Sequence, residues 1–114
     1  MNTFKNQARQ GDIFIKRIDR LPDGLRAAKK TPEGYWYVAH SESGHHHVME
    51  GACEVFESDD PTTLYLRVIE ESEVVLRHLK IGEYAHRALQ FTKGLFRLRI
   101  GREHTPDGWR KVTD

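Results

Sequence analysis

Histidine is the residue type through which this sequence could most readily do chemistry. Seven histidines occur among 114 residues, and three are consecutive: His45, His46 and His47. If residues 44–50 form an extended strand, successive side chains alternate between its two faces. His45 and His47 then share one face, and His46 takes the other. Two neutral imidazoles on one strand face are a common means of holding a divalent metal, so the triplet predicts part of a metal site.

The remaining ligands can come from two histidines later in the chain. His78 continues the parity of Val74 and Leu76, which form the apolar face of a predicted strand. In a small barrel, inward-facing residues from several strands converge, and His86 lies on a further extended segment. The alternatives are an ordinary polar turn for the triplet and a hydrogen-bonded core residue for His78. The predicted ligands of one divalent transition metal (zinc, nickel, iron or manganese) are His45, His47, His78 and His86.

The number of bound histidines would decide what such a metal does. With three ligands and an open position, the metal activates a water molecule and polarises a substrate, which suits hydrolysis of a phosphodiester. With four ligands in a closed tetrahedron, the metal is structural. A metal-free alternative uses two histidines as general acid and base, while Arg87, Arg97 or Arg99 holds a phosphate. The residues alone leave open whether the protein is an enzyme.

A second hypothesis rests on arginines. Over residues 96–100, apolar residues alternate with Arg97 and Arg99, so the apolar side chains face inward and the arginines outward. Arg67 and Arg77 could extend this basic face. Such a face beside aromatic residues could bind single-stranded nucleic acid. The protein would then be a non-catalytic binding module of a phage or mobile element that acts on nucleic acid or a host protein. The alternative is a solvated face paired with glutamates, because the formal net charge is only +1.

The whole chain has the rhythm of an all-β protein. Turn signals recur about every ten residues, and they separate eight or nine short strands without a long helix. Residues 12–18 are apolar on both faces, which predicts a strand that lies between two layers or lines a closed barrel. We therefore expect one small antiparallel barrel or sandwich of jelly-roll or cupin-like type over residues 11–114. Residues 1–10 have no period, and we expect them to form a loose N-terminal tail or a weak first element.

Composition limits the cellular compartments and the partners that we expect for the protein. Cys53 is the only cysteine, which excludes an intrachain disulfide and a cysteine-rich zinc module and is typical of the cytoplasm. No apolar run approaches the roughly 20 residues of a membrane-spanning helix, so no membrane partner is expected. The expected partners are a small molecule or nucleic acid. An exposed edge strand could also pair with a second copy to form a homodimer.

The chain also resembles a family of small uncharacterised proteins from bacterial, phage and plasmid genomes. These proteins begin with Gln-Gly-Asp and an apolar strand, and carry a Gly-His-x-His segment. The resemblance covers residues 10–114 and implies the same four histidines, but no activity. One departure is the segment 80–82, which in such proteins is often shorter and more acidic. The matching segments are Gln10-Gly11-Asp12, Asp19–Pro22, Gly44–His47, Leu64–Val68, Leu76–His78, His86, Gly94–Phe96 and Arg102–Pro106.

The triplet and its flank also resemble the first metal motif of cupin barrels, in which His-x-His is followed at a longer interval by Glu. Here only Val48 and Met49 separate His47 from Glu50. Because this spacing departs from the cupin pattern, we expect Glu50 to pair with a surface cation instead of a metal.

Overall fold

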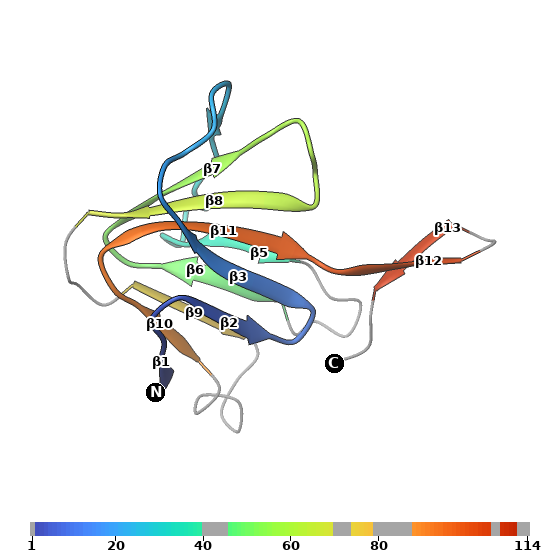
Figure 1. Cartoon of the computed structure of the whole chain (residues 1–114), viewed down its shortest axis with the longest axis horizontal. Coiled ribbons are helices and arrows are strands. Elements are labelled where there is room, and N and C mark those ends of the chain that lie inside the picture. Colours follow the sequence, from blue (N-terminus) through green and yellow to red (C-terminus); the bar gives the residue numbers. More distant parts are fainter. Residues whose placement is uncertain (1, 40–45, 70–73, 79–87, 106–107, 112–114) are drawn as a thin grey trace.

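Two β-sheets packed face to face form the body of the protein, and a hairpin projects from it (Figure 1). The computed structural model describes residues 2–39, 46–69, 74–78, 88–105 and 108–111. The first sheet contains, in spatial order, β1 (Asn2–Thr3), β10 (Leu89–Phe91), β9 (Val74–His78), β6 (His47–Glu50) and β5 (Trp36–Ala39). The second contains β2 (Gln7–Gln10), β3 (Ile13–Ile18), β11 (Gly94–Ile100), β8 (Thr63–Val68), β7 (Cys53–Glu57) and β4 (Arg26–Ala27). The hairpin pairs β12 (Arg102–Thr105) with β13 (Gly108–Lys111).

This architecture confirms the expected all-β fold. The described residues form thirteen strands, more than the eight or nine expected, because pieces as short as β1 and β4 carry no readable period. Neighbouring strands are antiparallel apart from β1, which pairs with β10 in parallel. The described part of the chain contains no helix long and apolar enough to cross a membrane.

The core lies between the two sheets and follows the predicted alternation. In β11, Phe96, Leu98 and Ile100 are buried, whereas Arg97 and Arg99 lie on the outer face. The first sheet contributes side chains such as Met49 and Leu76 from the opposite side. A period of two is enough to assign these faces, because successive side chains of a strand point to opposite sides of its sheet.

The strand β3 differs from its prediction in one respect. Ile13 and Ile15 are buried in the core, as expected, but Phe14 on the other face is 44% exposed. The second sheet therefore has only one face in the sandwich, and the apolar residue on its outer face is not covered by another layer of described residues. An exposed aromatic residue on a sheet face is a feature that local periodicity cannot anticipate.

Within the segment expected to be a loose tail, residues 2–10 contribute strands to both sheets. Strand β1 pairs with β10 and β2 pairs with β3. Between them, the ring of Phe4 packs edge-on against Phe91 and Phe96, with centroids 5.1 and 5.7 Å apart. The Arg17 side chain donates from Nε to the carbonyl oxygen of Lys5 at 2.7 Å. A single aromatic anchor and backbone pairing thus order a polar segment that has no apolar period of its own.

Candidate functional site

His47 is a buried polar residue at the start of β6. Its exposed fraction is 3%, and it shares the inward parity of Met49. His46 lies on the other parity, with its ring 5.6 Å from the ring of the half-exposed Tyr37. The alternation predicted for the triplet therefore holds for these two histidines. Only His47 is directed toward the space between the sheets.

Gln10 connects His47 to the rest of the sandwich. It ends β2 in the second sheet and is itself only 4% exposed. Its Nε2 donates a hydrogen bond to the carbonyl oxygen of Leu76 in β9, at 2.9 Å. Its Oε1 lies 2.8 Å from Nδ1 of His47 in β6. One side chain from the second sheet thus holds two strands of the first sheet, and both contacts are buried.

These two contacts together define the tautomer of His47. The carbonyl oxygen of Leu76 can only accept a hydrogen bond, so it must face the NH₂ group of Gln10. The amide oxygen of Gln10 then faces His47, and because it too can only accept, Nδ1 of His47 must carry the proton. In the neutral ring, the lone pair is on Nε2. Histidines that bind metals are commonly held in this manner, with the second nitrogen donating to an oxygen.

The strand register brings a second histidine position next to His47. In the antiparallel pair β6–β9, His47 and His78 are direct partners, followed by Val48 and Arg77 and then by Met49 and Leu76. Residues directly opposite one another in an antiparallel pair share a face, with Cβ atoms about 4.5–5.5 Å apart. Positions 47 and 78 are 31 positions apart in sequence but are nearest neighbours across the ladder.

The other predicted site residues are outside the described part of the chain. His45, His86 and Arg87 all fall there, as does the side chain of His78. Within the described residues, no three His, Cys, Asp or Glu side chains are grouped closely enough to hold a metal ion. The four-histidine cluster therefore stays a prediction, with two of its positions now placed side by side.

A tight turn after Gln10 fixes its position next to His47. Gln10 and Ile13 are paired at the ends of β2 and β3, so Gly11 and Asp12 form a two-residue hairpin loop. Gly11 has a φ of 58°, which favours glycine at the first position of such a loop. Asp12 is only 3% exposed, so the one polar side chain of this turn is buried. The Gln-Gly-Asp segment noted in the sequence is thus a structural unit that carries the partner of His47.

Glu50 pairs with a cation, as its spacing predicted. Its carboxylate accepts a 2.6 Å hydrogen bond from Nε of Arg77, and both side chains are partly exposed. The pair lies on the first sheet, so Arg77 does not extend the arginine face of β11. Arg67 does share that sheet, but its Nε is bound to Glu54 at 2.7 Å.

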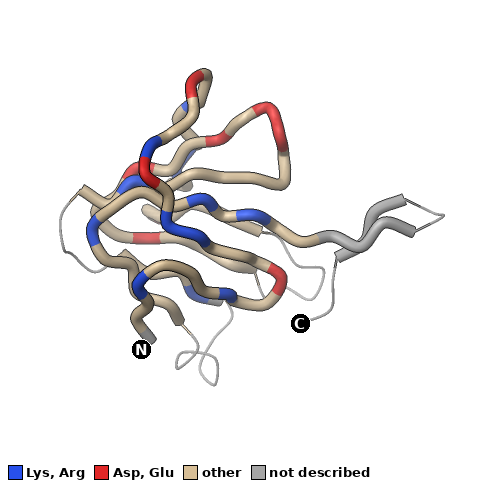
Figure 2. The backbone as a smooth tube through the Cα atoms, viewed as in Figure 1, with Lys and Arg blue, Asp and Glu red and all other residues tan. Residues whose placement is uncertain are grey.

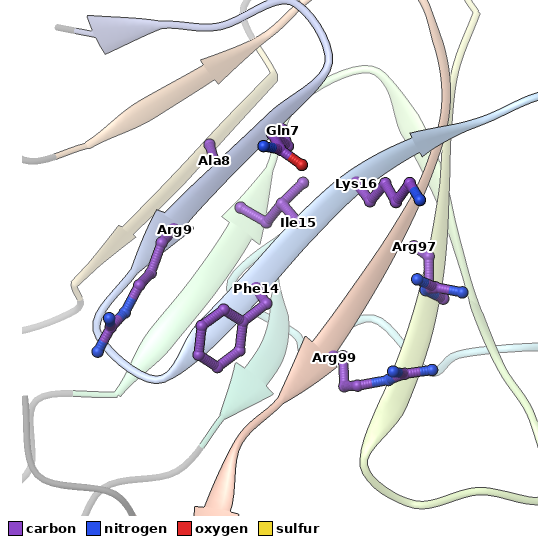
Figure 3. A pocket seen from close by; sticks show the side chains of 8 residues that line it. All are labelled: Gln7, Ala8, Arg9, Phe14, Ile15, Lys16, Arg97 and Arg99. Atoms are coloured by element: carbon purple, nitrogen blue, oxygen red, sulfur yellow. The ribbon is translucent and has the colours of Figure 1, made fainter.

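The predicted outward arginines of β11 border an open depression on the second sheet. Figure 2 shows basic residues along β3 and β11. The depression has a volume of about 690 Å³ and lies on the face opposite the core. Its lining residues are Gln7, Ala8, Arg9, Phe14, Ile15, Lys16, Arg97 and Arg99 (Figure 3).

Cys53 is not suited to act as a nucleophile. Burial raises the pKa of its thiol to about 11, so very little thiolate is present near neutral pH. We expect Cys53 in the native protein to react with Ellman's reagent at pH 8 on the order of a hundredfold more slowly than in urea. Cys53 is the single cysteine, so the measured reaction rate comes from this thiol alone. Rapid labelling of the folded protein would contradict this prediction.

Sequence reasoning missed the role of Gln10. Its residue type suggests no metal chemistry, and its partners His47 and Leu76 lie far along the chain. One signal was present: Gln10 continues the parity of Ala8, a partly buried residue, at the end of a strand beside a Gly-Asp turn. A polar side chain on a buried parity requires a hydrogen-bond partner, so this position could have been marked as one end of a buried contact.

Comparison with known proteins agrees with the resemblance to an uncharacterised family. Searches among curated proteins and among solved structures found no match. One family, described as a domain of unknown function (DUF8820), matches residues 9–101. This match begins next to Gln10 and includes His47 and His78. The chain therefore belongs to the DUF8820 family of domains of unknown function.

Proposed function

We propose that this domain binds one divalent transition metal ion, such as zinc, nickel, iron or manganese. The observation that carries the proposal is the buried contact between Gln10 and His47, which leaves the lone pair of the neutral imidazole on Nε2. A buried histidine held by an oxygen at Nδ1 is the arrangement that metal-binding histidines use. The proposed ligands are His45, His47, His78 and His86.

The strand register supports the pairing of two ligands. Neighbouring positions on antiparallel strands can bring two imidazoles to one ion without any change in the backbone, and His47 and His78 occupy such positions. The nearby core residues Met49 and Leu76 are fully buried, so the two strands are held by packing. A site supported by rigid strands keeps its ligands in place before the metal arrives.

The chemistry of the metal depends on how many histidines bind. If one coordination position stays open, the ion supports hydrolysis of a phosphodiester or similar bond by activating water. If all four histidines bind, the ion stabilises the sandwich instead. A hydrolysis screen of the metal-loaded protein against a chromogenic phosphodiester separates these two roles. Activity that survives exhaustive chelation would instead indicate acid–base catalysis by the histidines alone.

The test is elemental analysis of untagged protein after reloading with each metal and dialysis. We expect close to one ion per chain in the parent protein and none in a His47→Ala/His78→Ala variant. His46→Ala is the matched control, because it removes a histidine of the same triplet that packs on Tyr37 on the other parity. It should keep the full metal content. His78→Ala alone removes one proposed ligand but leaves the Gln10–His47 contact intact, so it should lose metal without losing the fold. Circular dichroism of each variant would reveal any unfolding.

Two results would overturn the proposal. The first is a parent protein that retains no metal after reloading. The second is a folded double variant that retains as much metal as the parent.

A further inference from the structure

The depression on the outer face of the second sheet collects positive charge. Four of its eight lining residues are cationic, and none is acidic. Lys16 and Arg97 are direct partners across β3 and β11, and Arg99 follows two residues along on the same face. In Figure 3, Lys16, Arg97 and Arg99 lie on one side of the depression, and Phe14 and Arg9 lie on the other.

The strand register arranges these residues in two parallel rows. One row crosses three strands as Arg9, Phe14 and Arg99, so an aromatic residue lies between two arginines across the sheet. The second row continues onto a fourth strand and contains Gln7, Lys16, Arg97 and Tyr65. Neighbouring rows are separated by two residues, or roughly 7 Å along a strand. Cations therefore repeat at regular intervals on both sides of an exposed ring.

The cations of this face are available to a ligand. In the described part of the chain, Lys16, Arg97 and Arg99 form no ion pair and no side-chain hydrogen bond. Arg9 donates only to the carbonyl oxygen of Gly11, and its guanidinium carbon lies 5.1 Å from the centre of the Phe14 ring. Arginines elsewhere differ, since the guanidinium of Arg67 is bound to a carboxylate.

One carboxylate does lie within electrostatic reach of Arg99. The pKa of Asp60 is lowered chiefly by hydrogen bonds from Thr62 and Thr63, with a smaller contribution from the charge of Arg99. The oxygens of Asp60 accept hydrogen bonds from these two threonines at 2.6 to 2.9 Å, and the described residues include no ion pair between Asp60 and Arg99. The guanidinium of Arg99 can therefore still meet a phosphate.

We propose that this cationic face, made of Arg9, Phe14, Lys16, Arg97 and Arg99, binds single-stranded nucleic acid. Guanidinium groups bind phosphate oxygens through charge-assisted hydrogen bonds, and an exposed aromatic ring offers a stacking surface to an unpaired base. A duplex fits this face poorly, because its bases are already stacked and a broad sheet surface cannot enter a groove. The proposal is independent of the proposed metal site, whose described histidine, His47, is buried between the sheets.

Fluorescence anisotropy with a labelled oligothymidine of 20 nucleotides tests the proposal. With four phosphate contacts, the logarithm of the binding constant should fall with the logarithm of salt concentration with a slope of about −2.8. Arg97→Ala/Arg99→Ala should weaken binding about tenfold or more and reduce the slope by about 1.4. The charge-matched control is Arg26→Ala/Lys29→Ala, which removes Arg26 of β4, at the opposite edge of the sheet, and the exposed Lys29 three residues later, and should leave binding nearly unchanged.

Phe14→Ala distinguishes nucleic acid from other polyanions. Loss of one stacked base should weaken oligothymidine binding roughly 5- to 150-fold while leaving the salt slope unchanged. Heparin, which has no bases, should bind Phe14→Ala as well as it binds the parent. The proposal is overturned if the parent does not bind the oligonucleotide at low salt, or if the Arg26/Lys29 control weakens binding as much as the Arg97/Arg99 variant. It is also overturned if a duplex or an acidic peptide binds more tightly than the single strand.

Discussion

Replacing Gln10 with leucine is expected to weaken the proposed metal binding by about 10- to 100-fold, although it removes none of the proposed ligands. The buried amide oxygen of Gln10 is the group that faces Nδ1 of His47, at 2.8 Å. Without it, the ring loses the partner that keeps the proton on Nδ1 and the lone pair on Nε2. The measurement is a competition titration with a chromogenic chelator, on protein loaded with the metal that elemental analysis identifies.

Two further readouts separate this positioning role from a loss of stability. Nitrogen NMR of the metal-free protein should show His47 with its proton on Nδ1 in the parent, and a mixed population in Gln10→Leu. Gln10→Glu keeps an oxygen toward His47 and should restore most of the metal affinity, although it cannot donate to Leu76. Gln7→Leu is the matched control on the same strand, because Gln7 is exposed. Equal losses from Gln7→Leu and Gln10→Leu would show that Gln10 has no special role.

The largest loss of stability is expected from Phe96→Ala, which should lower the free energy of unfolding by about 3–5 kcal/mol. Phe96 is fully buried, and its ring centre lies 5.0 Å from that of Phe91. The guanidinium of Arg17 covers the same ring at 4.6 Å, while its nitrogens donate to Thr92 and Lys93. Truncation would leave a cavity and remove the surface on which this arginine rests. Urea denaturation followed by circular dichroism measures the loss.

Phe14→Ala is the control for this prediction, since it makes the same chemical change in the same sheet. Phe14 is 44% exposed on the outer face, so its removal should cost much less, about 0.5–1 kcal/mol. A typical domain is stable by only 5–15 kcal/mol, so the two variants should be easy to distinguish. If Phe14→Ala were as destabilising as Phe96→Ala, the assignment of core and outer faces in the second sheet would be wrong.

In the candidate site, the face on which each histidine lies follows from the local sequence, whereas the histidine opposite it does not. Parity along the chain separated His46 from His47 and placed His78 on the apolar side of its strand, because strand periodicity depends only on neighbouring residues. The pairing of His47 with His78 depends on which strands are adjacent and in what register. Neither fact is encoded in a local pattern, since many registers satisfy the same alternation.

The cationic face shows the same division. The outward direction of Arg97 and Arg99 was predictable from the alternation in β11. Lys16 and Phe14 join them because β3 pairs with β11, and Arg9 joins them through β2, a segment for which a loose tail was expected. Arg77 was expected on this face but pairs with Glu50 on the other sheet. The sequence pattern predicts on which face of its strand a basic residue lies. It does not predict to which sheet that strand belongs, because this depends on the topology of the whole fold.

Turn chemistry and a period of two act over a few residues, and they are enough to predict the all-β class and the inward and outward residues of the regular strands. The candidate ligands also follow from residue type and parity along the chain. The contact by which Gln10 joins the two sheets at His47 spans 37 positions, so no local pattern contains it. A buried amide must find its hydrogen-bond partners wherever the fold brings them, and packing of the two sheets selects which they are.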